Sequence, residues 1–269
     1  MPPRPLSGVS HDRSFKENDM THEQISIRIH DGDCPAHVFT PAGQGPWPAV
    51  IFYMDGLGIR PTLFDMGQRL ADGGYLVLLP DLFYRAGPYA PLEPKKVFAT
   101  GNVRQAIAHL FESTDNARAA QDSEAFLAYL GTRTDVAGKK VGTTGYCMGG
   151  AISLTVAGTY PDRIAAAASF HGGNLAIDSE LSPHRLAPAM KGRIYVAGAD
   201  QDNSYPPEMA ERLERALSEA GVDHLCEIYP GALHGWTMAD FPVYDEAAAE
   251  RHWSALFNLL AATLARSDG

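Results

Sequence analysis

The residue best placed for covalent chemistry is Cys147, in the run Gly145-Tyr-Cys-Met-Gly-Gly150. A short β-branched run, residues 141–144, precedes it and is typical of the end of a buried strand. A small-residue apolar run, residues 151–157, follows and is long enough for a helix. The frame G-x-C-x-G-G at such a junction is the sequence form of a nucleophile elbow, with cysteine where serine is more frequent. The predicted chemistry is therefore nucleophilic attack by the Cys147 sulfur.

The glycines around Cys147 have a steric explanation. A strand that turns at once into a helix forces the middle residue into a strained conformation, and side chains at Gly145 and Gly149 would collide with neighbouring elements. The N-terminus of the following helix also places N–H groups and a partial positive charge beside the sulfur, which favours a thiolate and an oxyanion. The alternatives are a buried structural thiol and a G-x-G-x-x-G dinucleotide loop, whose spacing Cys147 and Met148 break.

A cysteine nucleophile needs a general base, and the base needs an acid that orients it. In chains with this elbow the order is nucleophile, acid, base. His234 lies in a glycine-flanked loop after the last predicted strand, and Asp200 and Asp202 follow the strand before it. Both carboxylates are candidates for the acid. His171 also follows a strand but precedes the acid position, so we expect it to line the pocket instead.

Apolar strand-like runs alternate with helical patterns along the chain. Such alternation is typical of the α/β class, a mostly parallel central sheet with helices on both faces. Residues 1–23 are predicted to be a flexible N-terminal tail, and residues 24–269 a single domain. Strands are predicted at residues 25–30, 34–40, 47–53, 75–80, 141–144, 164–170, 194–198 and 225–229, and helices at 64–73, 102–130 (two segments), 151–157, 207–221 and 245–265.

The overall composition argues against several classes of protein. The 269 residues carry a formal net charge of −10, which argues against nucleic acid as a partner. We find no apolar window suited to a membrane span or a signal peptide, so no membrane partner is expected. Three widely separated cysteines suit a reducing compartment, so we expect a cytoplasmic protein. Neither CxxC nor HExxH is present, so no metal is expected.

Five motifs together resemble those of the dienelactone hydrolase family of α/β-hydrolases. The resemblance spans residues 25–260 and implies an α/β-hydrolase fold. The family's D-x-x-x-P pattern favours Asp202 over Asp200, because Pro206 follows four residues later. Besides the cysteine elbow, the motifs are Asp202-Asn-Ser-Tyr-Pro206, Gly231-Ala-Leu-His-Gly235, Met54-Asp-Gly-Leu-Gly58 and Pro80-Asp-Leu-Phe-Tyr-Arg85.

The mechanism that this resemblance implies is cleavage of a small-molecule carboxylic ester or lactone through a thioester. The Cys147 thiolate attacks the carbonyl, and the backbone N–H groups of Met148 and Gly56 hold the oxyanion. His234, oriented by Asp202, helps to form the thiolate and later assists attack by water. No cofactor is required, and we expect a monomer or a homodimer.

Two departures from the family pattern concern the substrate and the thiol. Asp55 occupies the place of a glutamate that helps to ionise the thiol in family members that open dienelactone. We expect either that its shorter side chain still acts on the thiol or that it stops short of it. Of the two arginines that hold the substrate carboxylate in those members, Arg85 matches one, and Met238 replaces the other. His171 and Trp236 are further candidates for the substrate site.

Two other functions fit the same residues. One is a general carboxylesterase that acts on neutral small esters. The other is a non-catalytic member of the fold, in which Cys147 is a redox-sensing thiol or the pocket binds a ligand.

Overall fold

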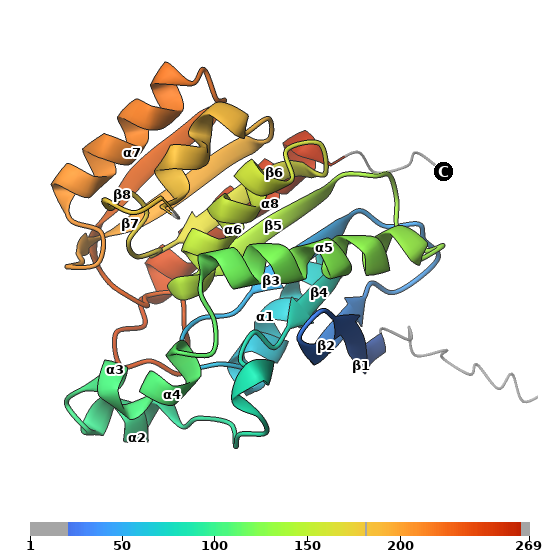
Figure 1. Ribbon diagram of the computed structural model, residues 1–269, viewed down its shortest axis with the longest axis horizontal. Coiled ribbons are helices and arrows are strands. Elements are labelled where there is room, and N and C mark those ends of the chain that lie inside the picture. The colour runs from blue at the N-terminus through green and yellow to red at the C-terminus, as the bar shows by residue number, and fades with distance from the viewer. Residues whose placement is uncertain (1–20, 181, 265–269) are drawn as a thin grey trace, which may run out of the picture.

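An eight-stranded sheet with the order β1-β2-β4-β3-β5-β6-β7-β8 forms the centre of the computed structural model, which describes residues 21–180 and 182–264 (Figure 1). β1 and β2 form an antiparallel hairpin, and β2 is antiparallel to β4. All other pairings are parallel, so the predicted mostly parallel sheet is confirmed. The strands are β1 (Thr21–Ile29), β2 (Gly32–Thr40), β3 (Ala49–Tyr53), β4 (Leu76–Pro80), β5 (Val141–Tyr146), β6 (Ile164–Phe170), β7 (Arg193–Gln201) and β8 (His224–Leu233).

The first hairpin begins earlier than the sequence pattern suggests. Thr21, which we place in the N-terminal tail, pairs with Thr40 in the β1–β2 register. The first residues of β1 are exposed, so they carry no apolar alternation by which a strand could be recognised. The rest of the predicted tail, residues 1–20, lies outside the described residues, as do residues 265–269.

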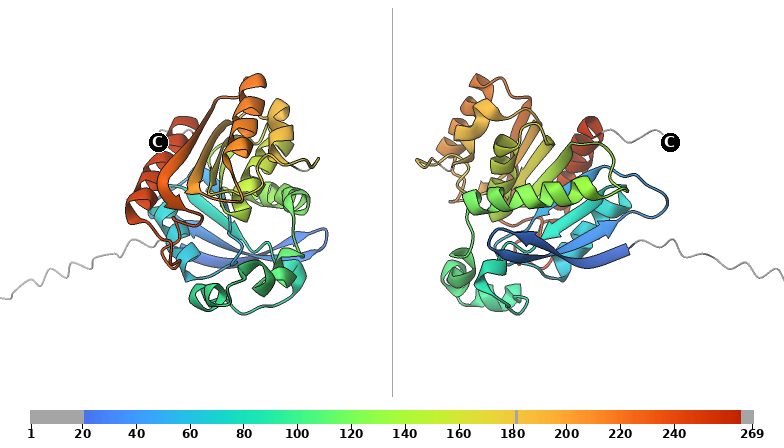
Figure 2. Two further views of the ribbon diagram at one scale, coloured as in Figure 1. Left: turned by 90° about the vertical axis from the view of Figure 1, so that its left-hand side faces the viewer. Right: turned by 45° about the vertical axis from the view of Figure 1, so that its right-hand side comes forward.

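Helices cover both faces of the sheet (Figure 2), as predicted. α1 (Pro61–Asp72) and α8 (Glu246–Thr263) pack on one face, and α5 (Asn116–Thr132), α6 (Met148–Thr159) and α7 (Pro207–Glu219) cover the other. Because helices lie on both sides, the central strands β3, β4 and β5 are buried along their whole length. Within residues 21–180 and 182–264, no helix is both long and apolar enough to span a bilayer.

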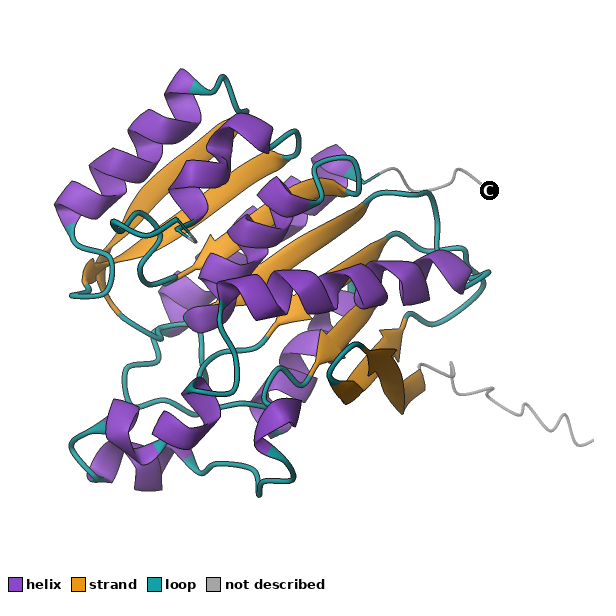
Figure 3. Cartoon of the chain, in the orientation of Figure 1, coloured by secondary structure: helices purple, strands orange, loops and turns teal. Residues whose placement is uncertain are grey.

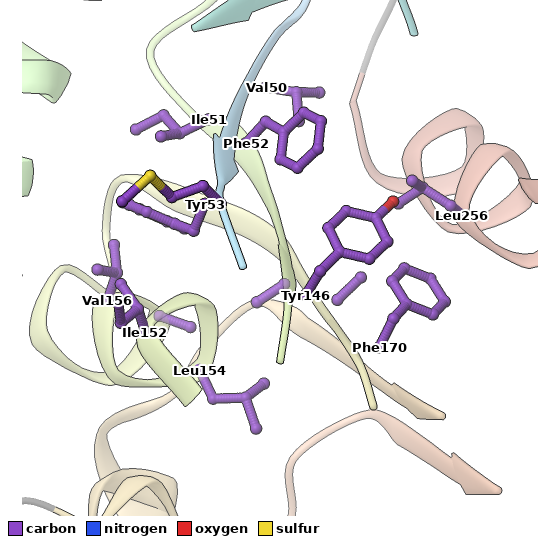
Figure 4. Close-up of a cluster of buried hydrophobic side chains, with 14 of the residues drawn as sticks. Val50, Ile51, Phe52, Tyr53, Tyr146, Ile152, Leu154, Val156, Phe170 and Leu256 are labelled. Carbon is purple, nitrogen blue, oxygen red and sulfur yellow. The ribbon is translucent and has the colours of Figure 1, made fainter. Parts of the chain in front are cut away.

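The hydrophobic core has one layer on each face of the sheet (Figure 4). Ile51 and Tyr53 point toward α6, whereas Val50 and Phe52 point toward Leu256 of α8, as the two-residue period of a strand requires. All five side chains are fully buried. This packing fixes the end of β3 beside the end of β5, so the loops that leave these two strands start next to each other.

The segment between β4 and α6 differs from its predicted structure (Figure 3). The sequence pattern predicts two helices over residues 102–130, but three occur there, α3 (Val103–Ala106), α4 (Ala108–Phe111) and α5, and a short α2 (Pro94–Ala99) precedes them. α3 and α4 are separated at Ile107, which has φ −117° and ψ 14° and packs with Leu57 and Val97. α5 begins separately because Asp115 accepts the N–H of Arg118 and caps the helix.

Two fully buried histidines, His171 and His252, link the stability of the fold to pH. The Nε2 of His252 lies 3.2 Å from the Tyr146 hydroxyl, and its Nδ1 lies against the carbonyl of Ala249. Burial lowers the pKa of His252 to about 3. Burial, with the charge of the nearby His234, lowers the pKa of His171 well below its usual value. Both histidines are therefore neutral in the folded protein near pH 7.

We expect the free energy of unfolding to fall as the pH drops below about 6.5, the pKa of histidine in an unfolded chain. Because the folded pKa is the lower one, each histidine takes up a proton on unfolding, which destabilises the fold by about 1.4 kcal/mol per group at pH 5.5. Urea unfolding at pH 7.5 and pH 5.5 measures this difference. His252→Gln should reduce this difference in the free energy of unfolding by about 1.4 kcal/mol, the contribution of one buried histidine. His30→Gln, which changes an exposed side chain, should leave the difference unchanged. Equal differences in both variants would contradict the assignment to His252.

Candidate active site

Cys147 lies at the turn between β5 and α6, where its motif predicts it. Its backbone has φ 54° and ψ −114°, a conformation that a residue with a side chain adopts only under constraint. A Cβ at Gly145 would lie 1.8 Å from the carbonyl oxygen of Gly149, and one at Gly149 would lie 2.2 Å from that of Tyr53. The predicted steric role of both glycines is confirmed. Their close contacts also bring the loop after β3 against the N-terminus of α6.

Cys147 opens into a cavity of about 370 Å³ at the carboxyl ends of the parallel strands. Ligands of open α/β sheets bind at this end. Within the described part of the chain, no group of three or more His, Cys, Asp or Glu side chains is arranged to hold a metal ion. The described lining residues are Phe111, Thr114, Asp115, Asn116, Cys147, Met148, Ala151, Gly173, Asn174, Ile177, Ser179, Ser182, Ser204 and His234.

The imidazole of His234 joins this cavity to a buried carboxylate. Its Nδ1 lies 2.6 Å from Oδ2 of Asp202, whose side chain is 3% exposed. Ser204 donates both its backbone N–H and its hydroxyl to Oδ1 of Asp202. Asp200 makes no such contact among the described residues, because its Oδ2 accepts the N–H of Gly231 at 3.1 Å. The structure thus pairs His234 with Asp202, the carboxylate that the D-x-x-x-P pattern favours.

The electrostatics of this group favour a charged imidazole beside the sulfur. Burial alone would lower the pKa of His234, but the charge of Cys147 and the hydrogen bond to Asp202 outweigh it and raise this pKa to about 11. Burial raises the pKa of Asp202, but hydrogen bonds from His234 and Ser204 outweigh it and lower this pKa below its usual value. The ionised Asp202 therefore holds Nδ1–H of His234, which leaves Nε2 for the sulfur.

Two backbone N–H groups, those of Met148 and Gly56, have no protein acceptor in the described residues. Met148 is the first residue of α6, where N–H groups lack partners within the helix. In the loop after β3, Asp55 accepts the N–H of Leu57 at its Oδ1 (2.7 Å) and that of Gly58 at its carbonyl oxygen (3.1 Å). The N–H of Gly56, between them, donates to no acceptor within residues 21–180 and 182–264. Both N–H groups are therefore free of a protein acceptor in the part of the chain that the structure describes, and Gly56 lies in the loop after β3, the strand that pairs with the elbow strand β5.

His171 and Trp236, which we predict to line the substrate site, are fully buried and absent from the cavity wall. The Nδ1 of His171 accepts the backbone N–H of Cys147 at 3.2 Å, and its Nε2 lies 2.7 Å from the Thr237 hydroxyl. The ring of His171 packs against the rings of His234 and Trp236. The prediction of substrate contact is therefore corrected. These two side chains support the elbow and the His234 loop from the interior.

Arg85 is also absent from the cavity wall. Its guanidinium donates to the two carboxylate oxygens of the fully buried Asp122, at 2.6 and 2.8 Å, and to Asp31 at 2.8 Å. All three of its nitrogens are engaged, so Arg85 ties α5 to the β1–β2 hairpin. The prediction that Arg85 binds a substrate carboxylate is corrected, because Asp122 and Asp31 already occupy the guanidinium.

Asp55 is bound by Arg60, a functional candidate that sequence reasoning missed. Nη1 and Nη2 of Arg60 donate to the two carboxylate oxygens of Asp55, each at 2.8 Å, and both side chains are 1% exposed. The Asp55 carboxylate accepts from Arg60 and from the N–H of Leu57, and it makes no hydrogen bond to the sulfur of Cys147. This arrangement matches the second of our two expectations, that the shorter side chain of Asp55 stops short of the thiol. The available signal was an arginine five residues after Asp55, immediately before Pro61, at the start of a helix.

Comparison with known proteins indicates the family and the fold of this chain. Residues 34–264 match the Dienelactone hydrolase family. Carboxymethylenebutenolidase of Pseudomonas putida is 28% identical over 233 residues, which are 86% of this chain and 92% of that protein. A dienelactone hydrolase-like promiscuous phosphotriesterase from metagenomic libraries has a TM-score of 0.73 at 23% identity, covering 91% of this chain and 99% of that one. Dienelactone hydrolase from Anabaena variabilis has a TM-score of 0.61 at 19% identity, with the same coverage.

Proposed function

The chain belongs to the dienelactone hydrolase family, and we propose that it hydrolyses carboxylic esters or lactones through a thioester on Cys147. His234 is the general base and acid, and Asp202 orients it. The observation that carries this proposal is the 2.6 Å contact between His234 and Asp202, beside a strained Cys147 that faces the same cavity as His234. A structural thiol alone would require neither the oriented imidazole nor the cavity.

In the first half of the reaction, the Cys147 thiolate attacks the carbonyl carbon and forms a tetrahedral oxyanion. The bond from that carbon to the leaving oxygen breaks, and Nε2 of His234 gives its proton to the departing alcohol. Water then attacks the resulting thioester while neutral His234 accepts a proton from it. Cleavage of the carbon–sulfur bond releases the acid and restores the thiolate–imidazolium pair. The balance is one ester and one water to one acid and one alcohol.

The developing oxyanion is stabilised by the N–H groups of Met148 and Gly56. Both groups belong to backbone that packing holds in place, so they need no rearrangement when charge develops on the carbonyl oxygen. One donor of this kind contributes roughly 10²–10³-fold to turnover in hydrolases of comparable chemistry. The partial positive charge at the N-terminus of α6 adds to this stabilisation.

The charge of the cavity wall favours substrates without a carboxylate. None of the described lining residues is Arg or Lys, and the one carboxylate among them is Asp115. The positive charge of His234 is balanced by the sulfur and by Asp202, and Arg85 is engaged elsewhere. We therefore propose a neutral ester or lactone as the substrate. The uncharged polar residues on the wall are Thr114, Asn116, Asn174, Ser179, Ser182 and Ser204. The hydroxyls of Ser182 and Ser204 already donate to the Leu175 carbonyl and to Asp202.

A neutral lactone and its carboxylated analogue, matched in ring and leaving group, test this proposal. We expect kcat/KM to be about two- to threefold higher for the neutral compound, because solvent and Arg118, 3.6 Å away, screen the charge of the half-exposed Asp115. Asp115→Asn removes this negative charge and should reduce the difference in kcat/KM between the two lactones. Asparagine also caps a helix, so α5 should stay intact. Asp162→Asn, at an exposed carboxylate outside the cavity, is the control and should leave the difference in kcat/KM between the two lactones unchanged.

Two results would count against the proposal in different ways. Preference for the carboxylated lactone would contradict the neutral substrate and leave the reaction type standing. Absence of turnover with both lactones and with short p-nitrophenyl esters would contradict hydrolysis by this site.

A further inference from the structure

The loop after β3 and the loop after β8 are joined by one buried guanidinium. Arg60 donates from Nε and Nη2 to Asp240, at 2.7 and 3.3 Å, and from Nη1 and Nη2 to Asp55, at 2.8 Å each. Nη1 also donates to the carbonyl of Gly58 at 3.1 Å. The side chain is 1% exposed and lies over the ring of Phe241, 5.1 Å from its centroid. The three nitrogens of Arg60 thus make five hydrogen bonds within one enclosed site.

Asp55 determines the conformation of the turn that contains Gly56. Its Oδ1 and its carbonyl oxygen accept the N–H groups of the two residues that follow Gly56. The ring of Phe111 closes the other side of the turn, since a Cβ on Gly56 would lie 2.6 Å from it. The direction of the Gly56 N–H therefore depends on Asp55, and Asp55 is held by Arg60.

Each end of the Arg60 connection is rigid. The Arg60 carbonyl accepts the N–H of Leu63 in the first turn of α1, which fixes the backbone of Arg60. Asp240 lies within the second of two consecutive turns, in which Met238 N–H donates to Gly235 and Phe241 N–H donates to Met238. The second of these loops begins with His234. Arg60 thus fixes the loop that carries Gly56 relative to the loop that carries the base.

We propose that Arg60 is a positioning residue for the oxyanion hole. By binding Asp55 and Asp240 at the same time, Arg60 holds the Gly56 N–H in a fixed position relative to the His234 loop. The inference rests on the proposed function, because it requires an oxyanion to form beside Gly56. Arg60 does not touch the substrate. Its planar fork, rather than its charge alone, is what spans two carboxylates, so lysine is a poor substitute.

Arg60→Lys and Asp240→Asn separate this role from a purely structural one. We expect kcat for p-nitrophenyl acetate to fall by about 10²-fold in Arg60→Lys and about tenfold in Asp240→Asn, with KM within about threefold of the wild type. Alkylation of Cys147 by iodoacetamide should stay within about twofold, because displacement at a saturated carbon forms no oxyanion. Arg133→Lys is the matched control, at an Arg–Asp pair beyond the opposite end of β5, and should leave kcat unchanged.

The combination of readouts decides between the explanations. Wild-type kcat in folded Arg60→Lys and Asp240→Asn would overturn the inference. A parallel loss of turnover and alkylation would also overturn it, because the damage would then be to the thiol and not to the oxyanion hole. If Arg60→Lys does not fold, Asp240→Asn alone decides, since it retains the pair between Arg60 and Asp55. Failure of the proposed function would give a different result: the wild-type protein would be alkylated at Cys147 but would hydrolyse no ester.

Discussion

Replacing Cys147 with alanine is expected to reduce kcat for a short p-nitrophenyl ester by about 10⁴-fold or more while the fold is retained. In the proposed mechanism the sulfur forms the covalent intermediate, so its removal leaves direct attack by water, assisted only by the oxyanion hole and by substrate binding. Steady-state turnover measures the loss. Acid quenching of the wild type during turnover, followed by peptide mass analysis, should show the mass of the acyl group on Cys147. Full activity in Cys147→Ala would contradict the mechanism.

The other two cysteines provide the matched controls. Burial raises the pKa of the Cys34 and Cys226 thiols, so both remain protonated and react slowly with alkylating agents. Iodoacetamide should therefore label Cys147 first, and the fraction of activity lost should equal the fraction of Cys147 that is alkylated. Cys226→Ala should retain turnover. Cys147→Ser should be much weaker than the wild type, because a hydroxyl is far harder to ionise than a thiol and His234 would have to remove its proton.

The positions of the elbow and of His234 could be predicted because local sequence determines them. Gly145 and Gly149 are required by contacts within one strand–turn–helix unit, so the motif contains its own steric explanation. The strands β5, β7 and β8 are recognisable as short runs containing β-branched, aliphatic or aromatic residues, and parallel strands bring their carboxyl ends to one edge of the sheet. The choice of Asp202 over Asp200 needed the family pattern, since both follow the strand that the sequence predicts at residues 194–198.

The pairing of the arginines could not be predicted, because it depends on residues far apart in the chain. Arg85 is engaged by Asp122, 37 residues later, and Arg60 by Asp240, 180 residues later. No local pattern at Arg85 indicates Asp122, and none at Arg60 indicates Asp240, although the other partner of Arg60, Asp55, lies only five residues before it. The breaks that divide α3, α4 and α5 escaped prediction for a similar reason, since the packing of Ile107 against Leu57 is a tertiary contact.

Replacement of Asp202 by asparagine is expected to lower kcat by roughly 10²–10³-fold. The same change in a serine triad costs about 10⁴-fold, because the imidazole takes the wrong tautomer, and a thiol that ionises more readily should be affected less. The raised pKa of His234 depends in part on Asp202. Its loss should therefore move the alkaline limb of the kcat profile, where His234 can no longer protonate the leaving alcohol, to lower pH. Turnover of an alkyl ester measured between pH 6 and pH 10 tests both effects, since the wild type, with a His234 pKa of about 11, should show no alkaline limb in this range and Asp202→Asn should show one.

Asp200→Asn is the matched control for Asp202→Asn, because the two carboxylates lie two residues apart at the carboxyl end of β7. Asp200 accepts one backbone N–H, that of Gly231, and does not contact the imidazole, so we expect kcat within about threefold of the wild type and an unshifted alkaline limb. A larger loss in Asp200→Asn than in Asp202→Asn would reverse the assignment of the acid. Equal small losses in both would mean that the charge of Cys147, rather than a carboxylate, keeps His234 protonated.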